Sequence, residues 1–120
     1  MDLRGLFDSS EDVQEFRAGT TIFAKGDPGN EMFVIMDGAV EIHFGTRIVE
    51  CLNAGEIMGE MALIDSNTRS ATAVAKTDCR LAVIDEKRFL FLVQKTPFFA
   101  LIIMKILADR LQRMNTRASE

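Results

Sequence analysis

Short apolar runs broken by turn residues are the feature that most constrains this chain. Between Gly19 and Asp85, runs rich in Val, Ile, Phe and Thr alternate with Gly, Asp and Asn, about every eight to twelve residues. This spacing is typical of an antiparallel β-sandwich or barrel, here of about seven or eight strands. Asp37–Gly38 separates MFVIM from AVEIHF, and such a dipeptide predicts a β-hairpin turn because glycine adopts positive φ without a steric penalty.

The residues ahead of Gly19 are polar and mixed. In DSSEDVQEF, we expect Asp8, Ser9 or Ser10 to cap one short helical turn. The chain length suits a single domain. We therefore predict one domain over residues 1–120, with a β-barrel over about 19–84 and C-terminal helices over about 86–115.

A helical period begins near Asp85, which is suited to cap a first helix that ends before Pro97. Pro97 then suits the first turn of a second helix that runs to about residue 115. We expect residues 98–104 to pack on the core and residues 107–114 to form a dimer surface or a mobile lid. The apolar stripe behind this expectation is Met104, Leu107, Leu111 and Met114. We attribute the basic residues of this helix to its dipole: Lys105, Arg110, Arg113 and Arg117.

Composition and charge disfavour several classes of protein. A net charge of -4 argues against a general nucleic-acid surface, and the chain has no apolar run long enough for membrane insertion. Cys51 and Cys79 lie in apolar, strand-like surroundings, so we expect buried free thiols and a reducing, cytoplasmic location. With His43 as the single histidine and no nucleophile motif, we expect neither a metal site nor enzymatic activity.

The stretch GEIMGEMALIDSNTRSATAVA, from Gly55 to Ala75, carries the chemistry. A short helix starting near Gly59 would present free backbone N–H groups to an anion. The planar fork of Arg69 suits a phosphate, with Ser70 adding a hydroxyl. Glu60 would repel a phosphate but would accept hydrogen bonds from sugar hydroxyls. The residues therefore indicate a sugar phosphate, and the alternative is a structural Glu60–Arg69 salt bridge across a turn.

The pattern G-E-I-M-G-E-M-A-L-I-x-x-x-x-R-S-A-T-A resembles the phosphate-binding cassette of cyclic nucleotide-binding domains. These domains occur in catabolite-activator-type regulators, in regulatory subunits of cAMP-dependent protein kinase and in cyclic-nucleotide-gated channels. KGDPGNEMFVIMDGAVEI and FLFLVQKTPFFALIIMKILADRL extend the resemblance over nearly the whole chain. It implies a mainly β fold: an antiparallel jelly-roll β-barrel of about eight strands, a short phosphate-binding helix and two C-terminal helices.

The resemblance also implies roles for individual residues. Glu60 would accept from the ribose 2′-hydroxyl, Arg69 would pair with the cyclic phosphate, and Ser70 would lie against the phosphate or the base. The ligand would be cAMP or cGMP, with cAMP favoured, and no cofactor is implied. The full set of ligand-binding residues is Gly59, Glu60, Met61, Ala62, Arg69, Ser70 and Ala71.

Two functions follow from this sequence. The first is a cyclic-nucleotide sensor whose ligand repositions the C-terminal helices. The second is a nucleotide-blind jelly-roll module for interaction or dimerisation. In either case we expect a homodimer or an effector protein to bind the C-terminal helix.

Overall fold

The computed structural model describes residues 3–7, 12–64 and 68–119. Its elements, in chain order, are a 3₁₀ helix η1 (Leu3–Leu6) and strands β1 (Val13–Phe16), β2 (Thr21–Phe23), β3 (Glu31–Asp37), β4 (Ala39–Phe44), β5 (Arg47–Asn53) and β6 (Ile57–Met58), followed by helix α1 (Met61–Ile64), strands β7 (Thr72–Ala75) and β8 (Cys79–Asp85), and helices α2 (Glu86–Lys95) and α3 (Phe98–Ser119).

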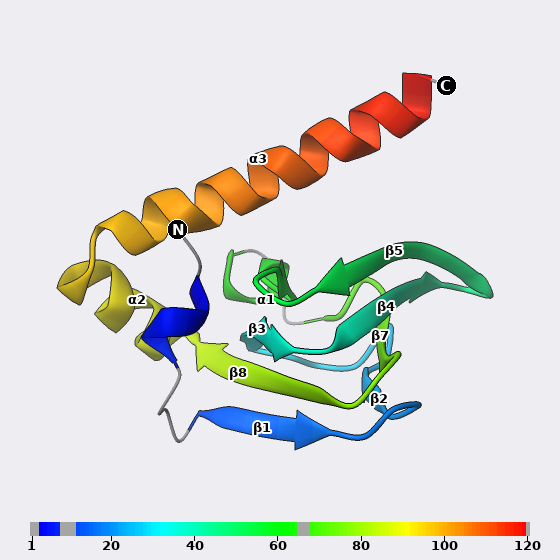
Figure 1. The fold of residues 1–120 in the computed structure, drawn as a ribbon, viewed down its shortest axis with the longest axis horizontal. Helices are drawn as coiled ribbons and strands as arrows, with labels where there is room; N and C mark the ends of the chain where they lie inside the picture. The colour runs from blue at the N-terminus through cyan, green and yellow to red at the C-terminus, as the bar shows by residue number, and fades with distance from the viewer. Residues whose placement is uncertain (1–2, 8–11, 65–67, 120) are drawn as a thin grey trace.

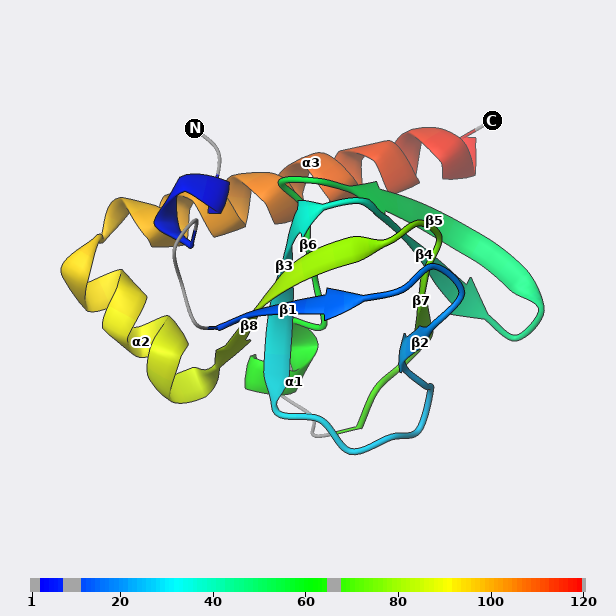
Figure 2. The same cartoon turned by 60° about the horizontal axis from the view of Figure 1, so that its bottom comes forward.

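The strands form two four-stranded sheets with the orders β1-β8-β3-β6 and β2-β7-β4-β5. Every strand pairing is antiparallel. The sheets do not close into a barrel but lie as a jelly-roll sandwich, with α2 and α3 along one side (Figures 1 and 2). The predicted fold class, mainly β with a short helix and two C-terminal helices, is confirmed.

The predicted hairpin at Asp37–Gly38 is wrong. β3 pairs with β6 and β8, whereas β4 pairs with β5 and β7, so the turn carries the chain from one sheet to the other. Gly38 has a φ of 95°, and a Cβ there would lie 2.4 Å from the carbonyl oxygen of Asp78. Glycine is therefore needed here because the chain passes close to Asp78 where it crosses between the sheets. The hairpin instead joins β4 and β5 through Gly45–Thr46.

The segment ahead of Gly19 also differs from expectation. Asp8, Ser9 and Ser10, the predicted helix caps, lie outside the described residues. Val13–Phe16 forms a strand instead of a helical turn, paired with β8 from Val13↔Ala82 to Phe16↔Cys79. Backbone pairing with a long neighbouring strand outweighs the local helix signal here, and it extends the sheet before the predicted start of the barrel.

Two apolar cores lie on the two faces of β3. Met32, Val34 and Met36 face η1, α2 and α3 in one core, whereas Phe33 and Ile35 face the other sheet. The strand is therefore buried on both faces, which explains why MFVIM is a continuous apolar run and does not alternate. β3 thus connects the helical layer to the layer that carries the cassette.

The C-terminal helices follow the predicted caps. The side chain of Asp85 accepts a hydrogen bond from the N–H of Arg88, and α2 ends at Lys95, before Pro97. α3 runs across the sandwich, with its C-terminal end above β5 in the view of Figure 1. None of the described helices is by itself long and apolar enough to cross a membrane; α2 and α3 meet that criterion only as a pair bent by 117°.

Two burial predictions need correction. Cys79 is buried as expected, but Cys51 is exposed, because it points away from the core on β5, a strand at the sheet edge. The apolar stripe of α3 lies along the border between the core and the solvent. Leu107 packs against the core, whereas Met104 and Leu111 are exposed to solvent.

Phe98 and Phe99 offer a matched test of how α3 is anchored. Phe99 is 0% exposed and packs edge-on against Phe89 with ring centroids 5.3 Å apart, whereas Phe98 is 51% exposed. We expect Phe99→Ala to lower the free energy of unfolding by about 3–5 kcal/mol, because it leaves a cavity between α3 and the core. Phe98→Ala should change it by less than about 0.5 kcal/mol. Urea denaturation measures both, and equal effects would contradict this packing.

Candidate functional site

A cavity of about 440 Å³ opens between the cassette, β4, β5 and the C-terminal half of α3. Its volume is in the range of small-molecule sites. All seven residues selected from the sequence line it, so the structure brings the predicted set to one place. The lining comprises Phe23, Ile42, Val49, Glu50, Leu52, Met58, Gly59, Glu60, Met61, Ala62, Thr68, Arg69, Ser70, Ala71, Arg110 and Met114.

Arg69 is the one charged residue that is buried in the described part of the chain, with 6% of its surface exposed. Its guanidinium carbon lies 4.4 Å from the ring centroid of Phe23 and 5.7 Å from that of Phe33. Nη1 donates to the carbonyl oxygen of Gly59 at a long 3.3 Å. Within the described part of the chain, Nε is buried and has no hydrogen-bond partner. The fork therefore keeps unused donor capacity on the wall of the cavity.

The electrostatics of Arg69 indicate a site for an anion. Burial lowers the pKa of its guanidinium, and the negative charges of Glu31, Asp27 and Glu60 act in the opposite direction. An arginine side chain stays protonated in proteins, so the cost of its desolvation must be offset by negative charge and hydrogen bonds. Its Nη1 hydrogen bond, to Gly59, goes to a neutral carbonyl oxygen. A phosphate would supply both the charge and the missing acceptors.

Glu60 does not pair with Arg69 at hydrogen-bond distance but with an arginine from the other end of the chain. Its Oε1 accepts from Nη1 of Arg110 at 3.0 Å, and both side chains are largely buried. Nη2 of Arg110 also donates to the carbonyl oxygen of Ile57. The proposed alternative of a Glu60–Arg69 salt bridge is thus replaced by a bridge from the cassette to α3. A carboxylate has about four acceptor sites, so Arg110 leaves capacity for a hydroxyl.

Two further arginines continue this contact along α3. Arg113 lies 3.1 Å from Glu56 and 3.6 Å from Glu50, and Arg117 lies 2.6 Å from Glu50. We call Arg110, Arg113 and Arg117 the arginine ladder. The sequence interpretation assigned their charge to the helix dipole, whereas the structure places each against a carboxylate at the cavity rim. The ladder holds the C-terminal half of α3 over the cavity.

The family model described as "Cyclic nucleotide-binding domain" matches residues 13–96, which include all the strands from β1 to β8 and all of α2. The chain belongs to the cyclic nucleotide-binding domain family. This confirms the resemblance drawn from the cassette. Relatives of several kinds contain this domain, and each of those described below is longer than the segment that matches this chain.

The "Cyclic AMP receptor protein" of Thermus thermophilus is 35% identical over 99 residues, covering 78% of this chain and 46% of that protein. A cGMP-dependent protein kinase of Caenorhabditis elegans is 33% identical over 79 residues, covering 66% of this chain and 10% of the kinase. The crystal structure of the Thermus thermophilus catabolite activator protein superposes with a TM-score of 0.74 at 31% identity, covering 89% of this chain and 53% of that one. This chain therefore spans about half of the first relative's length, and less of the second.

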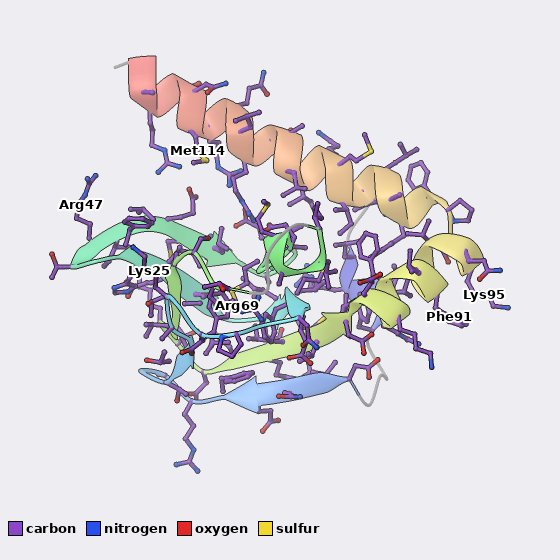
Figure 3. The ribbon with its side chains drawn as sticks, turned by 180° about the vertical axis from the view of Figure 1, so that it is seen from behind. Lys25, Arg47, Arg69, Phe91, Lys95 and Met114 are labelled. Carbon is purple, nitrogen blue, oxygen red and sulfur yellow. The ribbon has the colours of Figure 1, made fainter. Side chains whose placement is uncertain are left out.

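The remaining cavity lining of this cyclic nucleotide-binding domain is apolar. Ile42, Val49 and Leu52 come from β4 and β5, and Met114 comes from the barrel-facing side of α3. Figure 3 shows Met114 below α3 and Arg69 deeper among the strands, whereas Arg47 extends from the hairpin tip away from the cavity. The residues from β4 and β5 and Met114 form the apolar wall of the cavity.

Sequence reasoning located the cassette but missed several residues that line the cavity. Arg110 and Met114 lie about forty residues after the end of the cassette at Ala73, and only contact between α3 and the rim selects them. The signal available was the spacing of the arginine ladder on one helical face. The backbone N–H groups near Gly59 are not all free as expected, because the N–H of Ala62 donates to the carbonyl oxygen of Gly59 at 3.2 Å. Among the described residues, no cluster of His, Cys, Asp and Glu could hold a metal ion.

Proposed function

We propose that this domain is a sensor that binds cAMP in preference to cGMP in the cavity and transmits binding through α3. The observation that carries this proposal is Arg69: a buried guanidinium whose Nε lacks a partner among the described residues, on the wall of a cavity that also presents Glu60. A cyclic phosphate would bind the first and a ribose 2′-hydroxyl the second. Gly59, Met61, Ala62, Ser70 and Ala71 would complete the contacts around the sugar phosphate.

The preference for cAMP is supported by similarity, not by a specific contact to the base. The first relative is named for cyclic AMP and the second for cGMP, at comparable identity, but the first covers more of this chain. Ser70 is compatible with either base. The base would pack against the apolar wall from β4, β5 and Met114.

Titration calorimetry with cAMP and cGMP tests the ligand. We expect micromolar or tighter binding of cAMP and weaker binding of cGMP. Arg69→Leu should weaken cAMP binding by tenfold or more, because each charge-assisted hydrogen bond contributes about 1.5–3 kcal/mol. Arg47→Leu, the same change at the exposed hairpin tip, is the matched control and should leave affinity unchanged.

Two outcomes would contradict this binding proposal. If neither nucleotide binds below about millimolar, or about −4 kcal/mol, the domain is nucleotide-blind and the interaction module is the better description. If Arg69→Leu binds cAMP as the unsubstituted chain does, Arg69 does not hold the phosphate. Circular dichroism on each variant separates loss of binding from loss of fold.

The coupling to α3 is proposed from the shared carboxylate of Glu60. A ribose hydroxyl that hydrogen-bonds to Glu60 would change the hydrogen bond between this carboxylate and Arg110. A ligand can shift the helix between two positions only if it binds more tightly to one of them. We therefore expect cAMP to change hydrogen exchange over residues 107–118 more than over residues 98–104, where Phe99, Ile102 and Ile103 anchor the helix.

Variants of the arginine ladder sharpen the exchange measurement. Arg113→Gln with Arg117→Gln should speed exchange of 107–118 in the ligand-free chain, because it removes the ion pairs to Glu50 and Glu56. Lys105→Gln is the control, since Lys105 pairs with Asp109 within α3. Protection across α3 that does not change with cAMP would contradict a moving helix.

A homodimer through the outer face of α3 is the proposed assembly. Leu101, Met104 and Leu111 are exposed there, whereas Ile102 and Ile103 of the same helix are buried.

 The exposed fractions of Leu101, Met104 and Leu111 are 55%, 63% and 59%, respectively. With Ala108 they recur at spacings of three, four and three residues, which forms the narrow seam of a two-stranded coiled coil.

Sedimentation equilibrium tests this assembly. We expect the chain to be dimeric at about 100 µM, a weak association of about −5 kcal/mol or stronger. Leu111→Glu should make it monomeric because it places a charge in the seam. Thr116→Glu, on another exposed part of the same helix, should not. A chain that is monomeric at this concentration would contradict the homodimer.

A further inference from the structure

Gly29, in the loop between β2 and β3, lies against the guanidinium of Arg69. A Cβ built on Gly29 would lie 2.3 Å from Nε, 2.5 Å from Cζ and 2.7 Å from Nη2 of Arg69. Non-bonded carbon atoms pack at about 3.5–4.0 Å, so any side chain at this position would overlap the guanidinium. The space that glycine leaves is occupied by the arginine.

The backbone at Gly29 does not itself require glycine. Six glycines have positive φ, among them Gly26 in the same loop, but Gly29 is not one of them. An alanine could therefore adopt this conformation without backbone strain. The need for glycine at this position is steric, and the atoms that impose it belong to Arg69.

The loop cannot simply move back from the arginine, because it is bonded to the same segment. The N–H of Gly26 donates to the carbonyl oxygen of Arg69 at 2.8 Å, and the N–H of Arg69 donates to that of Asp27 at 2.9 Å. Pro28 and Thr68 form a β-bridge beside these bonds. The three residues just before Gly29 are thus held against the backbone of Thr68 and Arg69.

The rest of the guanidinium is enclosed in a similar way. The ring of Phe23 lies 4.4 Å from Cζ, and a Cβ on Gly59 would lie 2.8 Å from Nη1. Gly29 and Gly59 therefore leave room for the two ends of the fork, and Phe23 packs against it. A bidentate hydrogen bond to a phosphate requires the plane of the fork to be fixed, which this slot provides.

We propose that Gly29 is a positioning residue for ligand binding: its missing side chain forms the slot that orients the Arg69 fork toward the cavity. This inference rests on the proposed function for its effect on affinity, but not for the slot itself. A methyl group at position 29 displaces the guanidinium, and the phosphate loses its aligned donors. Gly29 does not touch the ligand and acts only through Arg69.

The test is a double-mutant cycle between Gly29→Ala and Arg69→Ala, with Gly5→Ala as the matched control. Gly5 also lacks positive φ, and a Cβ there would have no atom within 4 Å. We expect Gly29→Ala to weaken cAMP binding at least tenfold in the native background and to cause no further loss when Arg69 is already alanine. Gly5→Ala should leave affinity unchanged.

Unfolding free energies of the same four ligand-free chains give an independent readout. Gly29→Ala should destabilise the chain when Arg69 is present. It should be neutral or stabilising in the Arg69→Ala background, because the methyl group then has space and alanine restricts the unfolded chain. Failure of the unsubstituted chain to bind either nucleotide would remove the proposed function, but this stability cycle would still report on the slot.

Two results would overturn the inference. Equal destabilisation by Gly29→Ala in both backgrounds would show that its methyl group meets something other than Arg69. Destabilisation that depends on Arg69, with unchanged cAMP affinity, would show that the slot exists but does not orient the binding fork.

Discussion

The burial of one guanidinium governs how this domain is built around its cavity. Arg69 is 6% exposed, and its desolvation must be offset by charge and hydrogen bonds from its surroundings. The carbonyl oxygen of Gly59 accepts a hydrogen bond from Nη1, Phe23 supplies a ring face, and Glu31, Asp27 and Glu60 supply negative charge. Among the described residues, Nε has no hydrogen-bond partner, and Arg69 lines the cavity. The fold thus keeps a cation poised for a ligand without exposing it to water.

The sequence predicted what depends on contiguous residues and failed where partners are distant. The cassette and the Asp85 cap are local patterns, so Gly59–Ala62, Arg69–Ala71 and the start of α2 could be located before the structure. The Asp37–Gly38 turn misled because the same dipeptide serves a hairpin or a crossing between sheets, and pairing across the chain decides which. Neither the partner of Glu60 nor the steric role of Gly29 has a local signature.

α3 is held to the sandwich by two interactions of different character. Phe99, Ile102 and Ile103 bury its first half in the core, and burial of this kind is insensitive to salt. The arginine ladder holds its second half through partly exposed ion pairs, which individually contribute about 0–1 kcal/mol and weaken as salt rises. The second half is therefore the part whose position a ligand at Glu60 could shift at modest energetic cost.

This division of α3 makes the helix a lever. In the proposed sensor, Phe99 would be the fulcrum and Glu60 would act through Arg110, near the middle of the arm; the far end lies at Ser119. At about 1.5 Å per residue, the arm from the fulcrum to the end is roughly 30 Å, nearly twice the distance to Arg110. A rigid tilt that moves Arg110 by a small amount therefore moves the end by about twice as much. In the proposed sensor, the geometry of the helix alone would therefore amplify a displacement at Glu60.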